Sequence, residues 1–275
     1  MKIRTGFEIS YESSQPTPMV LMLSVHPSRF HDLVTPQTIS FDPPTPSRDY
    51  RDGFGNVCTR LVAPAGWLTI ATDFIIADAG KPDPTTPDAV QHPVEDLPDE
   101  VLVYLLGSRY CETDSLSETA WSLFGNTPPG WARVQAICDY VNAHISFGYE
   151  YANPTKSAWG AFMEKRGVCR DFTHLAVAFC RCMNIPARYC TGYLGDIGIP
   201  PAPYPMDFSA WFEVYLGGRW HTFDARHNTP RIGRIPMAYG RDATDVAIST
   251  SFGRSSLVGF KVHTDEVRPD LELTS

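Results

Sequence analysis

The chain has 275 residues, of which 43% are hydrophobic and 20% charged, a balance typical of a globular protein with a buried core. Its net charge of −8 argues against nucleic acid and anionic membranes as main partners. No apolar run approaches the roughly 18 residues of a membrane-spanning helix, and the first six residues lack the apolar stretch of a secretory signal.

The cysteines indicate the redox environment. There are seven, at irregular spacing: Cys58, Cys111, Cys138, Cys169, Cys180, Cys182 and Cys190. An odd number without metal-ligand spacing favours free thiols over a disulfide framework or a structural zinc site. We therefore expect a cytoplasmic protein that needs no metal or other cofactor.

The first part of the chain, residues 1–80, predicts a β domain of sandwich type. Residues 7–11 and 66–74 alternate between apolar and polar side chains, and residues 19–25 form an apolar run rich in β-formers. A turn cluster at 52–56 separates two of the predicted strands. Several short strands with turns between them favour two packed sheets.

A Pro-rich, polar segment at 81–98 predicts a linker, and residues 99–275 predict a second domain that begins with helices. Within it, apolar residues recur at three- and four-residue spacing, which predicts one amphipathic helix: Val134, Ile137, Cys138, Val141 and Ile145. A further short helix is predicted over 157–165.

Cys169 is expected at or just before a helix N-terminus, because Gly167 ends a turn and the following pattern is helical as far as Pro186. Unpaired backbone N–H groups at a helix start favour an anion, so this position lowers the pKa of a thiol and makes it a nucleophile. The alternative is a small buried residue at a turn.

Three strands are expected next, at 187–194, 208–216 and 219–224, and Gly217-Gly218 predicts a two-residue hairpin between the last two. In that register Leu216 faces Arg219, and paired residue numbers sum to 435. Side chains alternate between faces, so one face is predicted to carry Ser209, Trp211, Glu213, Tyr215, Trp220, Thr222 and Asp224. Ser209 and Asp224 are then diagonal neighbours, whereas His221 points to the other face.

A cysteine at a helix start followed by a hairpin with polar residues on one face is the layout of papain-like acyl-transfer sites. At this point the chain resembles the transglutaminase-like superfamily in its bacterial form. The residues that carry the resemblance lie at 167–172, 185–193, 210–215, 218–220, 223–225 and 240–246, with an N-terminal signature at 50–56 and Arg60.

The resemblance implies an α+β fold, in which a β-sandwich-like N-terminal domain precedes a papain-like core with the cysteine helix packed on an antiparallel sheet. It implies that Cys169 is the nucleophile and that Asp224 orients the catalytic histidine. It also implies amide hydrolysis or acyl transfer through a thioester, on a peptide or protein amide substrate.

One position departs from the family pattern. The usual His-Ala-Trp is Ser209-Ala210-Trp211 here, and a serine hydroxyl is a poor proton acceptor near neutral pH. The site recruits another histidine, or the protein binds without turnover as a scaffold, or residue 209 has been altered from its natural identity. The best substitute base is His227, which follows the predicted strand where the chain could curl back.

Three other residues are candidates for substrate contacts. Asp171 lies in the first turn of the cysteine helix, where an acid is also favoured by the helix dipole alone. Asp207 precedes Ser209 on the same face of the strand, and Trp211 is expected to wall the cleft unless it belongs to the core.

Overall fold

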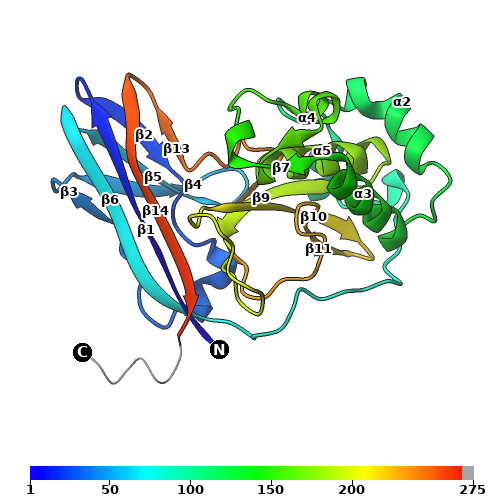
Figure 1. Ribbon diagram of the computed structural model, residues 1–275, viewed down its shortest axis with the longest axis horizontal. Coiled ribbons are helices and arrows are strands. Elements are labelled where there is room, and N and C mark those ends of the chain that lie inside the picture. Colours follow the sequence, from blue (N-terminus) through cyan, green and yellow to red (C-terminus); the bar gives the residue numbers. More distant parts are fainter. Residues whose placement is uncertain (268–275) are drawn as a thin grey trace.

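The structure is a computed structural model that describes residues 1–267. Its two parts lie side by side in Figure 1, with β-sheets on the left and a mixed helical and β part on the right. The predicted α+β class is confirmed.

The β part consists of two antiparallel sheets of four strands each. One has the order β14-β1-β6-β3 and the other β13-β2-β5-β4. The strands are β1 (Lys2–Ser13), β2 (Thr17–Leu21), β3 (Ser40–Asp42), β4 (Ser47–Arg51), β5 (Val57–Ala63), β6 (Gly66–Ala77), β13 (Ser249–Ser251) and β14 (Ser255–Glu266). Apolar side chains of both sheets share one core, including Ile9 and Ile70 of the first sheet and Met19 and Leu61 of the second.

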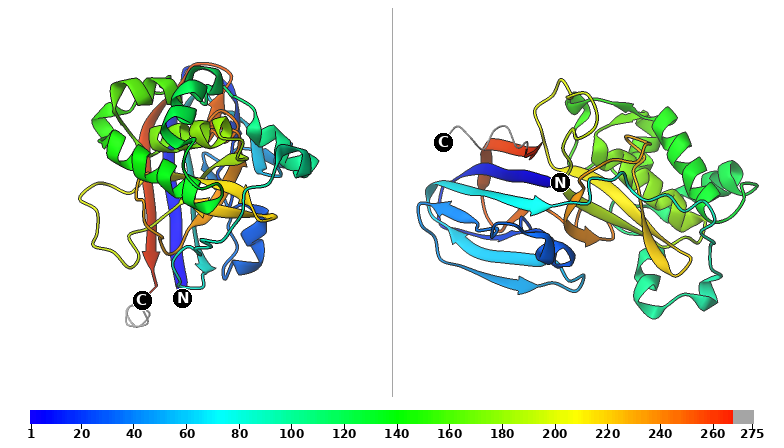
Figure 2. Two further views of the ribbon diagram at one scale, coloured as in Figure 1. Left: turned by 90° about the vertical axis from the view of Figure 1, so that its right-hand side faces the viewer. Right: turned by 90° about the horizontal axis from the view of Figure 1, so that it is seen from below.

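The second predicted domain, 99–275, differs from the structure in its last part. β14 pairs along most of β1, and β13 pairs with β2, so residues 249–266 complete the N-terminal sheets. Figures 1 and 2 show β1 and β14 side by side in three views. The physical reason is that β1 and β2 would otherwise present unpaired backbone groups at a sheet edge.

The second part is built around a sheet of order β11-β10-β9-β12. Its strands are β9 (Ala187–Tyr193), β10 (Ser209–Leu216), β11 (Arg219–Phe223) and β12 (Ile235–Gly240). The helices are α1 (Asp99–Leu102), α2 (Thr113–Phe124), α3 (Trp131–His144), α4 (Ala158–Glu164) and α5 (Cys169–Cys182), and the short β7 (Ser146–Phe147) and β8 (Arg166–Gly167) pair in parallel.

α5 is the central helix of this part. Its apolar face, including Leu175 and Phe179, shares one core with Phe212 and Val214 of β10. All of its residues from Asp171 to Cys182 are buried. The other face of the sheet, which carries Trp211, is turned away from the helices.

The hairpin of β10 and β11 has the predicted register. Glu213 pairs with Thr222 and Tyr215 with Trp220, and Leu216 faces Arg219. Gly217 and Gly218 both have positive φ, 57° and 82°, which two-residue hairpin loops require and glycine adopts without strain.

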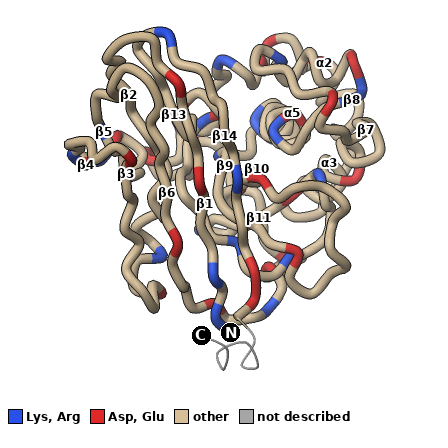
Figure 3. The backbone as a smooth tube through the Cα atoms, turned by 60° about the vertical axis from the view of Figure 1, so that its left-hand side comes forward, with Lys and Arg blue, Asp and Glu red and all other residues tan. Residues whose placement is uncertain are grey.

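The two parts are joined by buried contacts. The Asn56 side chain is fully buried; it donates to the Tyr239 carbonyl (2.8 Å) and accepts from the Tyr239 amide (2.9 Å). Lys and Arg are interspersed with Asp and Glu along both parts (Figure 3). Within residues 1–267, no helix has the length and apolar character to cross a membrane.

Candidate active site

Cys169 is the first residue of α5, as the sequence predicted, and Val168 is the N-cap. The carboxylate of Asp171 reaches back and accepts a hydrogen bond from the Val168 amide (2.9 Å). A Cβ at Gly167 would lie 2.4 Å from Oδ2 of Asp171, so only glycine leaves room for this contact. Asp171, a candidate for substrate contact, is fully buried and stabilises the helix start.

The Cys169 thiol is half-buried, next to Tyr189 and Ala210. Burial raises its pKa to about 11, although Arg226 and the backbone of Ala210 act in the opposite direction; Asp207 raises it further. The expected lowering of the pKa by the helix start is therefore outweighed, because desolvation disfavours the thiolate. The resting thiol is protonated near neutral pH and needs a base to become a nucleophile.

Ser209 begins β10 and pairs with Gly192 of β9. Its neighbour in sequence, Ala210, packs against Cys169. Ser209 takes the place of the family histidine in the sequence, shares a strand face with Trp211 by alternation, and brings no imidazole to the site.

Another imidazole lies next to Asp224. Nδ1 of His227 lies 2.8 Å from Oδ2 of Asp224, and Oδ1 of Asp224 accepts from the His227 and Arg226 amides (3.0 Å each). The Asn228 amide donates to the Asp224 carbonyl (2.8 Å), which closes the turn. The chain after β11 thus curls back, and a carboxylate orients an imidazole as in a catalytic dyad.

Asp224 is a buried carboxylate that stays ionised. Burial alone would raise its pKa, but the Arg234 guanidinium and the hydrogen bonds from His227 hold that pKa well below its usual range. Nη2 of Arg234 lies 2.9 Å from Oδ2 of Asp224, and Nε of Arg234 lies 2.8 Å from Asp83. The negative charge is fixed where it would stabilise an imidazolium form of His227.

Two other histidines near the helix and hairpin are held in structural roles. His174 is fully buried between the rings of Tyr110 and Tyr189, and burial lowers its pKa to about 3. His221 points to the opposite face from Asp224, as predicted, and its Nε2 lies 3.1 Å from the Leu216 carbonyl.

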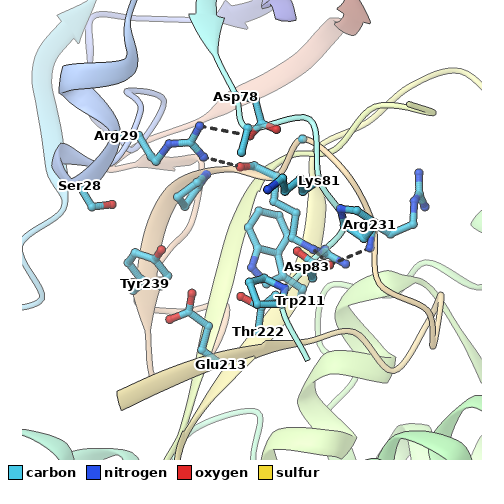
Figure 4. A pocket seen from close by; sticks show the side chains of 16 residues that line it. Ser28, Arg29, Asp78, Lys81, Asp83, Trp211, Glu213, Thr222, Arg231 and Tyr239 are labelled. Carbon is cyan, nitrogen blue, oxygen red and sulfur yellow. Dashed lines mark hydrogen bonds and ion pairs between the residues drawn. The ribbon is translucent and has the colours of Figure 1, made fainter. Parts of the chain in front are cut away.

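Trp211 is not beside Cys169. It lines a cavity of about 510 Å³ between the two parts of the molecule, together with Glu213 and Thr222 of the hairpin (Figure 4). Arg29 and Lys81 approach the same cavity from the N-terminal part and the connecting segment. The residues that line this cavity do not include Cys169, so the predicted role of Trp211 in the catalytic cleft has no geometric support.

The surroundings of the thiol combine the predicted Asp207 with Phe147 and Tyr149, which the sequence did not single out. The Arg226 guanidinium lies 3.8 Å from the ring centroid of Phe147, and Tyr149 packs against that ring (5.2 Å). Asp207 belongs to the same environment, and burial raises the pKa of its carboxyl while Arg226 opposes the rise. The alternating Phe147 and Tyr149 were a local signal, but nothing in the sequence placed them near Cys169.

No group of three or more His, Cys, Asp and Glu side chains is placed to hold a metal ion within residues 1–267.

Comparisons with known proteins agree with this geometry. Residues 119–225 match the sequence model of the transglutaminase-like superfamily. The crystal structure of "a Putative Cysteine Protease from Cytophaga hutchinsonii" superimposes with a TM-score of 0.84 and 30% sequence identity, over 98% of this chain and 92% of that one.

Two mycobacterial relatives are uncharacterized proteins. One from Mycobacterium leprae is 35% identical over 94 residues, a match that spans 33% of each chain. One from Mycobacterium tuberculosis is 29% identical over 233 residues, which cover 76% of this chain and 73% of the relative. With the family model and the shared fold in agreement, the chain belongs to the transglutaminase-like superfamily.

Proposed function

We propose that the protein is a cysteine-type amide hydrolase or acyltransferase in which Cys169 is the nucleophile, His227 the general base and Asp224 the orienting acid. The observation that supports this most is the 2.8 Å contact between Nδ1 of His227 and Oδ2 of Asp224. That contact holds the proton on Nδ1 and leaves the lone pair on Nε2 free to accept one.

In the proposed reaction, Nε2 of His227 takes the proton from Sγ of Cys169 as the sulfur attacks the carbonyl carbon of the amide. The oxygen that becomes negative is stabilised by backbone N–H groups at the start of α5. The imidazolium then returns its proton to the leaving amine as the C–N bond breaks, which gives a thioester. Water or a second amine, deprotonated by the same imidazole, releases the acyl group.

The substitution of Ser209 for the usual histidine fits this scheme. Asp224 is retained, and it binds an imidazole that comes from the turn after β11 rather than from the first residue of β10. If Asp224 were only a remnant of a dyad with the family histidine at position 209, it would not be expected to contact another imidazole.

A second candidate function, recognition without turnover, is favoured by one observation. Burial raises the pKa of the Cys169 thiol to about 11, and the sulfur makes no hydrogen bond to an imidazole in the described part of the chain. A scaffold that retains the cleft would behave in this way.

Turnover of a peptide-amide library by the wild-type protein and by Cys169→Ala separates the two functions. The amidase predicts activity that Cys169→Ala abolishes, and iodoacetamide that labels Cys169 first because the other six cysteines are buried. No turnover by the wild type, with uniform slow labelling of all seven cysteines, would support the scaffold.

The substrate class and the cellular location are proposals as well. The substrate is a peptide or protein amide, and adding a primary amine to the assay distinguishes hydrolysis from crosslinking by the product formed. The location is the cytoplasm, a proposal that rests on the odd and irregularly spaced cysteines.

A further inference from the structure

Arg226 lies beside the candidate nucleophile without an acidic partner. Its guanidinium is half-buried on the face of the Phe147 ring, and it forms no ion pair with a carboxylate of residues 1–267. Its neighbours along the chain differ in this respect, because Arg231 and Arg234 each pair with carboxylates. A guanidinium that is not paired with a carboxylate has N–H donors available to a negatively charged ligand.

The position of Arg226 is fixed by the same contacts that build the candidate site. Its amide donates to Asp224 (3.0 Å), and its carbonyl accepts from the Asn142 side chain (2.8 Å). Phe147, on which the guanidinium lies, pairs with Gly167, two residues before Cys169. The backbone of Arg226 is thus fixed next to Asp224, and its guanidinium lies on a ring whose strand pairs just before the start of α5.

The platform below Arg226 is aromatic. The ring of Phe147 packs against Tyr149 (5.2 Å) and Tyr204 (6.2 Å), and Tyr204 is 50% exposed. A guanidinium stacked on an aromatic face keeps its N–H edge free, and that edge matches a carboxylate in two parallel hydrogen bonds. The group that completes this arrangement is an incoming carboxylate.

Asp207 supplies the opposite charge in the same environment. It acts on Cys169 in the opposite sense to Arg226, and Arg226 in turn opposes the rise in the pKa of the Asp207 carboxyl, but no ion pair joins the two among residues 1–267. A carboxylate that enters beside Arg226 is therefore repelled from the Asp207 side, which restricts where on the substrate the charge can lie.

We propose that Arg226 selects substrates with a carboxylate close to the scissile amide, such as an acidic side chain or a free chain end next to the reacting carbonyl. The proposal names the substrate class of the site described above and so rests on the proposed function. It also makes a claim about binding next to Cys169 that needs no turnover to be tested.

The first test compares two alkylating reagents of nearly equal size, iodoacetate and iodoacetamide, which differ in carrying a carboxylate or a neutral amide. The measured quantity is the ratio of their rates at Cys169, followed by mass spectrometry of the intact folded protein. Arg226→Gln is expected to lower the iodoacetate to iodoacetamide ratio about tenfold, as the loss of one charge-assisted hydrogen bond implies. Asp207→Asn is expected to raise it.

Two controls keep this test decisive. Arg226→Lys retains the charge and is expected to keep part of the preference, whereas Arg254→Gln removes an exposed arginine elsewhere and is expected to leave the ratio unchanged. An equal ratio in the wild type and in Arg226→Gln overturns the proposal, and so does an equal fall in Arg254→Gln.

The second test uses matched peptide amides that differ only in Glu or Gln next to the scissile bond. The wild type is expected to prefer the acidic peptide in kcat/KM by about tenfold or more, and Arg226→Gln to lose that preference. Equal kcat/KM for both peptides in the wild type overturns the proposal. If the wild type cleaves neither peptide, the proposed function fails, and the alkylation ratio still decides whether Arg226 binds a carboxylate.

Discussion

Protonation decides what Cys169 can do. Burial holds the thiol in its neutral form, with a pKa of about 11, so the position at the helix start is not sufficient for activation. The oriented imidazole of His227 gives the site a proton acceptor that Ser209 cannot provide. Activation by a base, rather than by a resting thiolate, is the central claim for this protein.

The ionisation of Asp224 leads to a prediction about how the free energy of unfolding depends on pH. Its pKa in the folded protein lies well below the value of about 3.9 in an unfolded chain. Its ionised form therefore stabilises the fold above about pH 4, and this contribution is lost as pH falls further. Asp224→Asn removes one of the two carboxylates that pair with Arg234 and leaves only Asp83, and it is expected to lower the free energy of unfolding at pH 7 by about 1–3 kcal/mol.

Urea unfolding at several pH values checks this. The difference between the wild type and Asp224→Asn should narrow below pH 4 by up to about 1.4 kcal/mol per pH unit. A difference that stays constant from pH 7 to pH 2.5 would show that the carboxylate is not linked to stability in this way.

At the scale of elements, the start of α5 depends on a glycine. A Cβ at Gly167 would lie 2.4 Å from Oδ2 of Asp171, so Gly167→Ala forces the cap of the helix apart. We expect a loss of about 1–3 kcal/mol in the free energy of unfolding, as for a buried polar group that loses its hydrogen bond. Faster alkylation of the other cysteines should accompany it if α5 loosens.

The matched control is Gly160→Ala in α4. A Cβ there has its closest contact at 3.3 Å, with Cγ of Lys156, a far milder approach than at Gly167, and alanine is favoured over glycine within a helix by up to about 1 kcal/mol. Urea midpoints should therefore fall for Gly167→Ala and stay equal or rise for Gly160→Ala. Equal shifts in both variants would mean that the Asp171 cap does not hold the helix start.

Elements with a local signal could be predicted from the sequence. The register of the hairpin follows from Gly217-Gly218. The start of α5 follows from the turn before Cys169, and its end follows from Pro186. The roles of individual side chains were less predictable. Asp171 faces inward to the backbone, and Trp211 lies on the sheet face opposite α5. Both outcomes depend on what packs against the element, which no single stretch of sequence encodes.

At the scale of the whole molecule, the two parts share an apolar core, to which Tyr193, Phe208 and Ile235 of the second part contribute, and buried hydrogen bonds cross the same interface. Asn56 satisfies both backbone groups of Tyr239 in a fully buried position. Asn56→Ala leaves a buried N–H and a buried C=O without partners, at a cost of about 1–3 kcal/mol each. The urea midpoint should therefore fall, while intrinsic fluorescence and far-UV circular dichroism still report one transition, because the two parts share one apolar core. A midpoint equal to that of the wild type would show that the Asn56 contacts do not stabilise the interface.

The pairing of β14 with β1 marks the limit of prediction at this scale. The two strands are separated by more than 240 positions, and most of β14 is exposed, so it carries only a weak alternating pattern. The role of His227 was partly predictable, unlike the pairing of β14 with β1. The sequence offered it as a substitute base, but only the turn around Asp224 brings its imidazole to the carboxylate.

The most direct measurement of the central claim is kcat/KM for a cleaved peptide amide in the wild type and in His227→Gln, with the exposed His31→Gln as control. If His227 is the base, His227→Gln should lower kcat/KM by about 10²–10⁴, while iodoacetamide still reaches Cys169 and His31→Gln remains at the wild-type value. A kcat/KM for His227→Gln within about threefold of the wild type, far below the loss expected for a general base, would contradict the account.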